Sequence, residues 1–110
     1  MKLGLLITAG PIHQEVRSAL QLARAARAKG WEVDLFLMED GVGCAKAGAR
    51  SPLAPQLAGL LAQGARVSLC AYNAELRGLR CEEVVPGIVW GSQYDLAQIV
   101  SGCDRFLYFG

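Results

Sequence analysis

The chain has 110 residues, enough for one domain with a hydrophobic core and no need of disulfides or a structural metal. Hydrophobic residues make up 53% of it, which excludes a disordered protein, and 11 basic residues nearly balance 10 acidic ones. No basic patch points to nucleic acid, and no apolar run is long enough to span a bilayer or form a signal-peptide core. We therefore expect one cytoplasmic domain over residues 1–110, with neither a nucleic-acid nor a membrane partner.

The first half of the chain predicts two strands joined by a helix and followed by a loop. The apolar run Lys2–Thr8 lacks helical spacing and is typical of a buried strand. In Gln14–Lys29 the apolar side chains recur at the i, i+3, i+4 spacing of one helical face, and Gly30 can take the left-handed cap. Glu32–Met38 is the second strand. The small side chains of residues 42–51, which include Cys44, predict an irregular or mobile loop.

The second half of the chain continues the alternation of strands and helices. A leucine stripe over residues 53–61 predicts a helix that ends at Gly64, and a short helix ending at Gly78 follows the next strand. Ser92 and Asp95 resemble a capping box at the start of the last helix. The expected strands are Arg66–Cys70, Ile88–Trp90 and Arg105–Phe109.

This alternation, without any hairpin signal, predicts an α/β protein. We expect a three-layer α/β/α fold, in which helices cover both faces of a five-stranded parallel sheet. All strands of such a sheet share one carboxyl edge, where ligands gather. The segments expected at that edge are Ala9–His13, Glu39–Arg50, the turn after Cys70, and Trp90–Ser92.

Four cysteines stand at positions 44, 70, 81 and 103, without a C-x-x-C pair and without zinc-like spacing to the single His13. In a cytosol they should be free thiols, and we expect no metal site and no cofactor. Cys103 falls on the apolar face of the last helix, which favours a place in the core. Cys81 lies in a connection and could act as a resolving thiol.

Cys70 combines a strand end with a following helix start. The unpaired N–H groups and the dipole at a helix amino terminus favour negative charge, which lowers the pKa of a thiol placed there. Arg77 adds a cation to the same segment, and the Asn73 amide is close in sequence. The competing interpretation is a small buried hydrophobic residue, because free cysteine is among the most buried residue types.

His13 opens the first helix at the same predicted edge. Its imidazole could cover the thiol or supply a proton, whereas a loop histidine is more often only solvated. No phosphate-loop motif occurs in the sequence, including around Gly10-Pro11.

In its order of segments the chain resembles the DsrE/DsrF-like family of small sulfur-relay proteins. The resemblance runs over nearly the whole chain, and its most telling part is Cys70 with Ala74 and Arg77-Gly78 behind it. Further matching segments are Leu5–Pro11, Ala28–Gly30, Val33–Leu37 with Asp40–Val42, Pro86–Ile88, Gly91-Ser92 and Cys103–Phe109. The departure is Tyr72-Asn73, which is bulkier than the small residues expected beside the thiol.

The resemblance implies an oligomeric three-layer protein that carries a persulfide on the cysteine matching Cys70. In this hypothesis the Cys70 thiolate accepts a sulfane sulfur from a donor protein and passes it to an acceptor thiol. Arg77 and Asn73 would steady the anion, and neither a metal nor an organic cofactor is required. The alternatives are a structural subunit that carries no sulfur, as in relatives that lack the cysteine, and a small-ligand binding module at the same edge.

Aromatic residues toward the carboxyl end predict an assembly. Trp90, Tyr94, Tyr108 and Phe109 provide more aromatic surface than so short a segment needs for its own core. Such residues are enriched in protein interfaces, and the resemblance also implies several copies. We expect a homo-oligomer, a trimer or a hexamer; the alternative is that all four residues pack internally.

Overall fold

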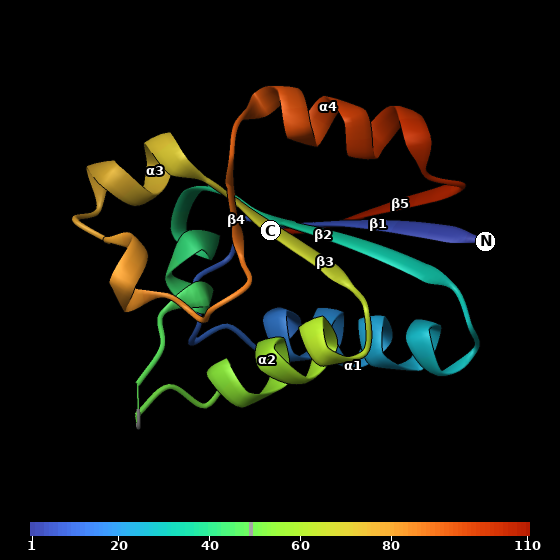
Figure 1. Cartoon of the computed structure of the whole chain (residues 1–110), viewed down its shortest axis with the longest axis horizontal. Helices are drawn as coiled ribbons and strands as arrows, with labels where there is room; N and C mark the ends of the chain where they lie inside the picture. The colour runs from blue at the N-terminus through green and yellow to red at the C-terminus, as the bar shows by residue number, and fades with distance from the viewer. Residues whose placement is uncertain (49) are drawn as a thin grey trace.

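The computed structural model describes residues 1–48 and 50–110 and has the three-layer α/β/α architecture that the sequence predicted. Five parallel strands form one sheet in the order β4-β3-β2-β1-β5. Figure 1 shows α1 and α2 on one side of this sheet and α4 on the other. The strands are β1 (Lys2–Ile7), β2 (Glu32–Leu37), β3 (Arg66–Cys70), β4 (Val89–Gly91) and β5 (Arg105–Phe109).

The α-helices match the predicted pattern of apolar faces and caps. They are α1 (Gln14–Ala28), α2 (Ala54–Ala62), α3 (Ala71–Leu76) and α4 (Gln93–Gly102). The structure also has two 3-10 helices that the sequence did not predict, η1 (Glu39–Ala45) and η2 (Cys81–Glu83). The residue after α1, Lys29, is followed by Gly30 at φ 82°, the left-handed conformation that suits glycine. Ser92 and Asp95 form the expected capping box of α4.

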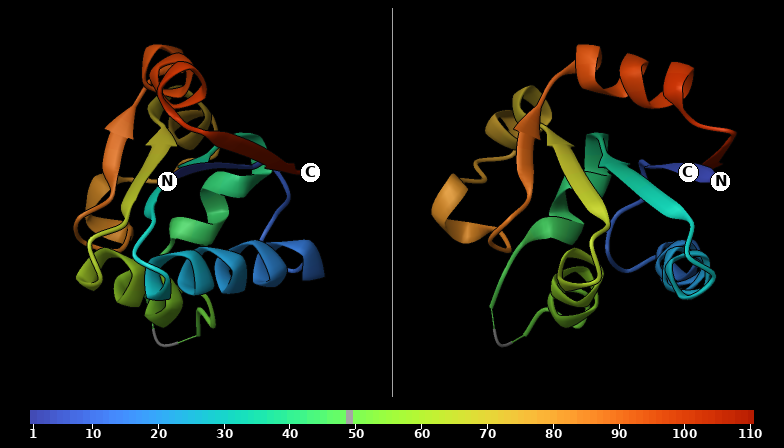
Figure 2. Two further views of the ribbon diagram at one scale, coloured as in Figure 1. Left: turned by 90° about the vertical axis from the view of Figure 1, so that its right-hand side faces the viewer. Right: turned by 45° about the vertical axis from the view of Figure 1, so that its right-hand side comes forward.

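The two faces of the sheet are covered unequally. On one face the alternate residues of β1, β2 and β3 join α1 and α2 in a large apolar core, which includes Leu5, Leu35 and Leu57. On the other face a small cluster contains only three buried residues, Phe36, Cys70 and Ile99. Figure 2 shows α4 crossing that face, with α1 and α2 together on the opposite side.

The segment after β2 differs from the predicted loop. Residues 42–45 belong to the 3-10 helix η1 and are mostly buried, with Cys44 inside the main core. Residue 49 of the predicted loop lies outside the described residues. The helix packs directly on β1, because a Cβ at Gly41 would overlap the carbonyl of Ile7. Glycine at this position therefore allows a backbone approach that any side chain would prevent.

Among the described residues, no helix has the length and apolar character needed to cross a bilayer.

Candidate functional site

Cys70 ends β3 at the carboxyl edge of the sheet and is the N-cap residue of α3. Its side chain lies on the α4 side, in the cluster with Phe36 and Ile99, and the residue is only 4% exposed. Its partner in the adjacent edge strand is Gly91, so β4 places no side chain beside the thiol. A Cβ at Gly91 would come within 2.7 Å of the Asp95 carboxylate, so the first turn of α4 occupies the space above this position.

The small cluster that contains Cys70 is surrounded by half-buried apolar side chains. Those packed against it are Leu6, Met38, Leu96 and Phe106. The Gln93 amide contacts the Met38 sulfur at 3.3 Å, which links the first turn of α4 to these side chains. Methionine side chains such as Met38 are flexible and adapt to their surroundings.

The other three thiols lie in different surroundings. The Cys44 thiol is buried, contacts the Ala9 carbonyl at 3.7 Å, and has its pKa raised to about 12 by burial. The half-buried Cys103 thiol contacts the Val100 carbonyl at 3.7 Å. Cys81 is exposed on η2. Of the four, Cys70 is the cysteine that stands at a strand end on the carboxyl edge.

The helix α3 is held against η1 by polar contacts. The Asn73 side-chain oxygen accepts a hydrogen bond of 2.7 Å from the Glu39 backbone N–H. Glu39 has φ 53°, a left-handed conformation that is uncommon for a residue with a side chain. Arg77 pairs with Asp40 at 3.0 Å and also donates to the Asn73 carbonyl. Asn73 and Arg77 therefore fix the helix that begins at Cys70.

The structure brings His13 and Arg77 together but turns the Cys70 side chain away from them. His13 and Arg77 line a pocket of about 470 Å³, which we call the mixed pocket because Asp40, Lys46 and Glu83 also line it. Cys70 does not line it, and among the described residues no hydrogen bond joins its thiol to Arg77, Asn73 or His13. The bulk of Tyr72 points outward into solvent.

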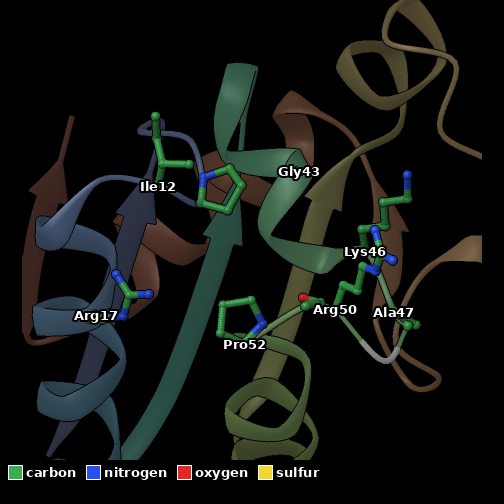
Figure 3. Close-up of a pocket in the computed structure, with 10 residues that line it drawn as sticks. Ile12, Arg17, Gly43, Lys46, Ala47, Arg50 and Pro52 are labelled. Atoms are coloured by element: carbon green, nitrogen blue, oxygen red, sulfur yellow. The ribbon is translucent and has the colours of Figure 1, made fainter.

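A second pocket adjoins the mixed pocket, and sequence reasoning missed it. Its volume is about 590 Å³, and it lies between the start of α1 and the segment that joins η1 to α2. Figure 3 shows Arg17 on the α1 side and Lys46 and Arg50 on the opposite side, with Pro52 between them. We call it the basic pocket, lined chiefly by Ile12, Arg17, Gly43, Lys46, Arg50 and Pro52. No single motif signals it, because its cations come from two distant segments.

Two buried polar groups lie under α4. Asp34 is two residues before Phe36 in β2, and Ser68 is two residues before Cys70 in β3. The Asp34 carboxylate and the Ser68 hydroxyl each have a buried oxygen without a hydrogen-bond partner among the described residues. Both line a small cavity of about 130 Å³ with Lys2 and Arg66. Burial raises the pKa of Asp34, and the nearby Arg66 and Lys2 oppose that rise.

Among the described residues, no group of three or more His, Cys, Asp or Glu side chains is placed to hold a metal ion.

A family model shows which family the chain belongs to. The model of the DsrE/DsrF-like family matches residues 1–109. The chain is 34% identical over 109 residues to an uncharacterized protein of Methanopyrus kandleri, with 94% of this chain and 90% of the relative covered. It is 33% identical over 114 residues to an uncharacterized protein of Methanocaldococcus jannaschii, with 99% and 100% covered.

Solved structures show the same fold. The crystal structure of the ychN protein of E. coli superposes with a TM-score of 0.87 at 28% identity, covering 99% of each chain. A protein of unknown function from Methanobacterium thermoautotrophicum superposes with a TM-score of 0.79 at 15% identity, covering 96% of this chain and 97% of its own. The second likeness concerns the fold alone.

Proposed function

Because the chain belongs to the DsrE/DsrF-like family, whose usual role is sulfur relay, we propose that it carries sulfur as a persulfide on Cys70. The observation that carries this proposal is the placement of Cys70 at the carboxyl end of β3 and at the N-cap of α3. In parallel sheets this edge is where ligands and reacting groups gather. The curated relatives are uncharacterized, so the proposal rests on the family and on the position of this thiol.

The reaction is an exchange at sulfur without net oxidation. The Cys70 thiolate attacks the outer sulfur of a donor persulfide, a new S–S bond forms, and the donor thiolate leaves. Cys70 then carries the sulfane sulfur, and an acceptor thiolate takes it by the same attack. The transfer needs neither a metal nor an organic cofactor; the donor is a persulfide and the acceptor a thiol of partner proteins.

Asn73 and Arg77 support Cys70 in this proposal by holding α3 in place. Their contacts with Glu39 and Asp40 fix the helix whose first N–H groups face the Cys70 end. Arg77 shares its charge with Asp40, so it steadies a thiolate less than an unpaired arginine would. His13 lines the mixed pocket, which Cys70 does not line. Its imidazole could therefore give a proton only to a group bound in that pocket.

The second candidate function is a structural subunit that carries no sulfur. The observation that favours it is the burial of Cys70, because a thiol of a residue that is only 4% exposed is slow to react unless the side chains around it move. Members of the family are often oligomeric, and we propose that several copies assemble through the exposed aromatic residues Tyr94 and Tyr108.

Intact mass spectrometry separates the two candidates. The parent and four single variants, Cys44→Ser, Cys70→Ser, Cys81→Ser and Cys103→Ser, are incubated with a sulfane-sulfur donor and weighed. We expect the parent to gain the mass of one sulfur atom and Cys70→Ser to lose that gain while keeping its circular dichroism spectrum. If Cys70→Ser gains sulfur as the parent does, Cys70 is not the carrier. If no protein gains sulfur, the structural-subunit function is favoured.

A further inference from the structure

We propose that the basic pocket binds a small organic anion, a molecule with a phosphate group and an apolar part. The pocket lies beside α1 and the start of α2, on the face of the sheet opposite the Cys70 side chain. The proposal concerns a second site, and it does not depend on sulfur chemistry at Cys70.

The charged residues that line the pocket are all positive. Arg17, Lys46 and Arg50 line it, and none of its other lining residues is acidic. The ion pairs among the described residues belong to Arg77 and Arg80, so none of these three cations is paired with a carboxylate there. A cleft lined by one sign of charge concentrates ions of the opposite sign, although the whole chain has a net charge of only +1. Two of the three cations are arginines, whose planar guanidinium suits phosphate.

One part of the pocket wall is fixed by backbone contacts. The Ala47 N–H donates to the Glu83 carbonyl at 2.8 Å, and the Val85 N–H donates to the Ala45 carbonyl at 2.9 Å. These bonds hold the chain on both sides of Lys46 against residues 83–85. Gly43 lies against the Pro11 ring, where an added Cβ would come within 3.4 Å of the ring. The lining around Lys46 and Gly43 is therefore anchored.

An apolar surface adjoins the cations. Ile12 lies in the short turn before α1 and is 86% exposed. Pro11 and Pro52 line the same pocket. A bare inorganic ion would leave this surface uncovered. A volume of about 590 Å³ falls within the range of small-molecule sites. The combination suits a ligand that places its phosphate among the cations and its apolar part on Ile12.

The adjoining mixed pocket is a poorer site for an anion. Its Arg77 is already paired with Asp40, and Glu83 adds a further negative charge. A nucleic acid is also a poorer occupant than a small molecule, because single-strand binding uses an extended positive groove with stacked aromatic rings. The basic pocket has three cations and no aromatic side chain among its lining residues.

The test is a titration of the ¹⁵N-labelled protein with phenyl phosphate, inorganic phosphate and phenol, followed by amide chemical shifts at low salt. We expect saturable shifts from phenyl phosphate at residues 12, 43, 46–48, 50 and 51, and weaker binding of the other two probes. The double variant Arg17→Gln/Arg50→Gln should bind phenyl phosphate about tenfold or more weakly, because two of the three cations that attract the anion are lost. Added NaCl should weaken binding by the parent.

The matched control is Arg24→Gln/Arg105→Gln, which removes two exposed arginines outside the pocket. It should bind as the parent does, and so should Cys70→Ser, which separates this site from the proposed sulfur carrier. Absence of saturable shifts would overturn the proposal. Equal weakening by both double variants would show non-specific attraction and overturn it too. Binding of phenol as tight as that of phenyl phosphate would exclude an anion site, and equal binding of inorganic phosphate would exclude the apolar part.

Discussion

The two faces of the sheet differ in how much buried apolar surface covers them. The face under α1 and α2 is sealed by a core in which residues such as Leu35 and Leu57 are completely buried. The face under α4 has a single helix, of which only Ile99 is buried. Two polar groups there have a buried oxygen without a hydrogen-bond partner among the described residues. The first face provides stability. The second face is thinly covered and contains the thiol of Cys70.

This difference places the proposed chemistry where the structure is easiest to open. Low local burial is the usual basis of local opening in proteins. Apolar side chains on α4 are also left in solvent, with Tyr94 84% exposed and Val100 about half exposed. We infer that a second copy covers part of this face, and the following predictions test the contrast between the two faces.

The largest expected effect concerns assembly. The parent should sediment as a trimer or hexamer at micromolar concentration, and Tyr94→Ser/Val100→Ser should reduce it to the monomer mass of 11.7 kDa. The physical reason is the loss of two large exposed side chains from the surface of α4. Sedimentation equilibrium measures the mass.

The control for assembly is Ile12→Ser, which removes an equally exposed apolar side chain beside the opposite face. It should leave the sedimented mass unchanged. A parent protein that already sediments at 11.7 kDa would contradict the assembly prediction.

The second prediction compares one buried side chain from each face. Leu35→Ala should lower the free energy of unfolding by about 4 kcal/mol, and Ile99→Ala by about 2 kcal/mol, because a cavity under a thinly packed helix can collapse. Despite its smaller effect, Ile99→Ala should speed alkylation of Cys70 more than Leu35→Ala does, since Ile99 packs in the cluster with the thiol. Denaturant unfolding and iodoacetamide labelling measure the two effects. If labelling follows global stability instead, Leu35→Ala reacts faster and the idea of local opening is wrong.

The third prediction concerns Asp34 beneath α4. Because burial raises the pKa of Asp34, the folded protein binds that proton more tightly than the unfolded chain does. The free energy of unfolding therefore falls as pH rises from the ordinary carboxyl range through the raised pKa, and stays lower at neutral pH. Asp34→Asn should flatten this fall and stabilise the protein by about 1 kcal/mol at pH 7.

The matched control for Asp34 is Glu32→Gln, an exposed carboxylate on the same strand. Denaturant unfolding between pH 4 and pH 7 should give the parent profile for this variant. An unchanged slope in Asp34→Asn would show that another group governs the pH dependence.

Most of the sheet could be predicted from the sequence because its strands are continuous apolar runs. The bounds of β3 and β5 match the prediction residue for residue. The fourth strand was predicted one residue early, because apolar Ile88 is buried before the ladder begins and Gly91 pairs with Cys70 despite having no side chain.

The 3-10 helix η1 and the pockets could not be predicted in the same way. The small residues of η1 carry no helical signal, and its position depends on the approach of Gly41 to β1. The position of Cys70 at the sheet edge could be predicted because it ends an apolar strand. Its burial could not, because the cluster around it includes residues distant in sequence, such as Met38 and Leu96. The prediction that Cys44 lies in an irregular loop was wrong, because tertiary contacts order that segment and bury the thiol.

The smallest expected effect concerns the strained residue between the two faces. Glu39 has φ 53°, which costs a residue with a side chain about 1 kcal/mol more than it costs glycine. Glu39→Gly should therefore raise the free energy of unfolding by about 0.5 kcal/mol, because the added freedom of the unfolded chain offsets part of the relief. Denaturant unfolding measures this change. Asp40→Gly is the control, because Asp40 itself has no positive φ and the variant should only be destabilised. A lower stability of Glu39→Gly would show that the added freedom of the unfolded chain outweighs the relief of strain at residue 39. If the variant is more stable but loads sulfur onto Cys70 more slowly, the strain at Glu39 positions α3 for transfer.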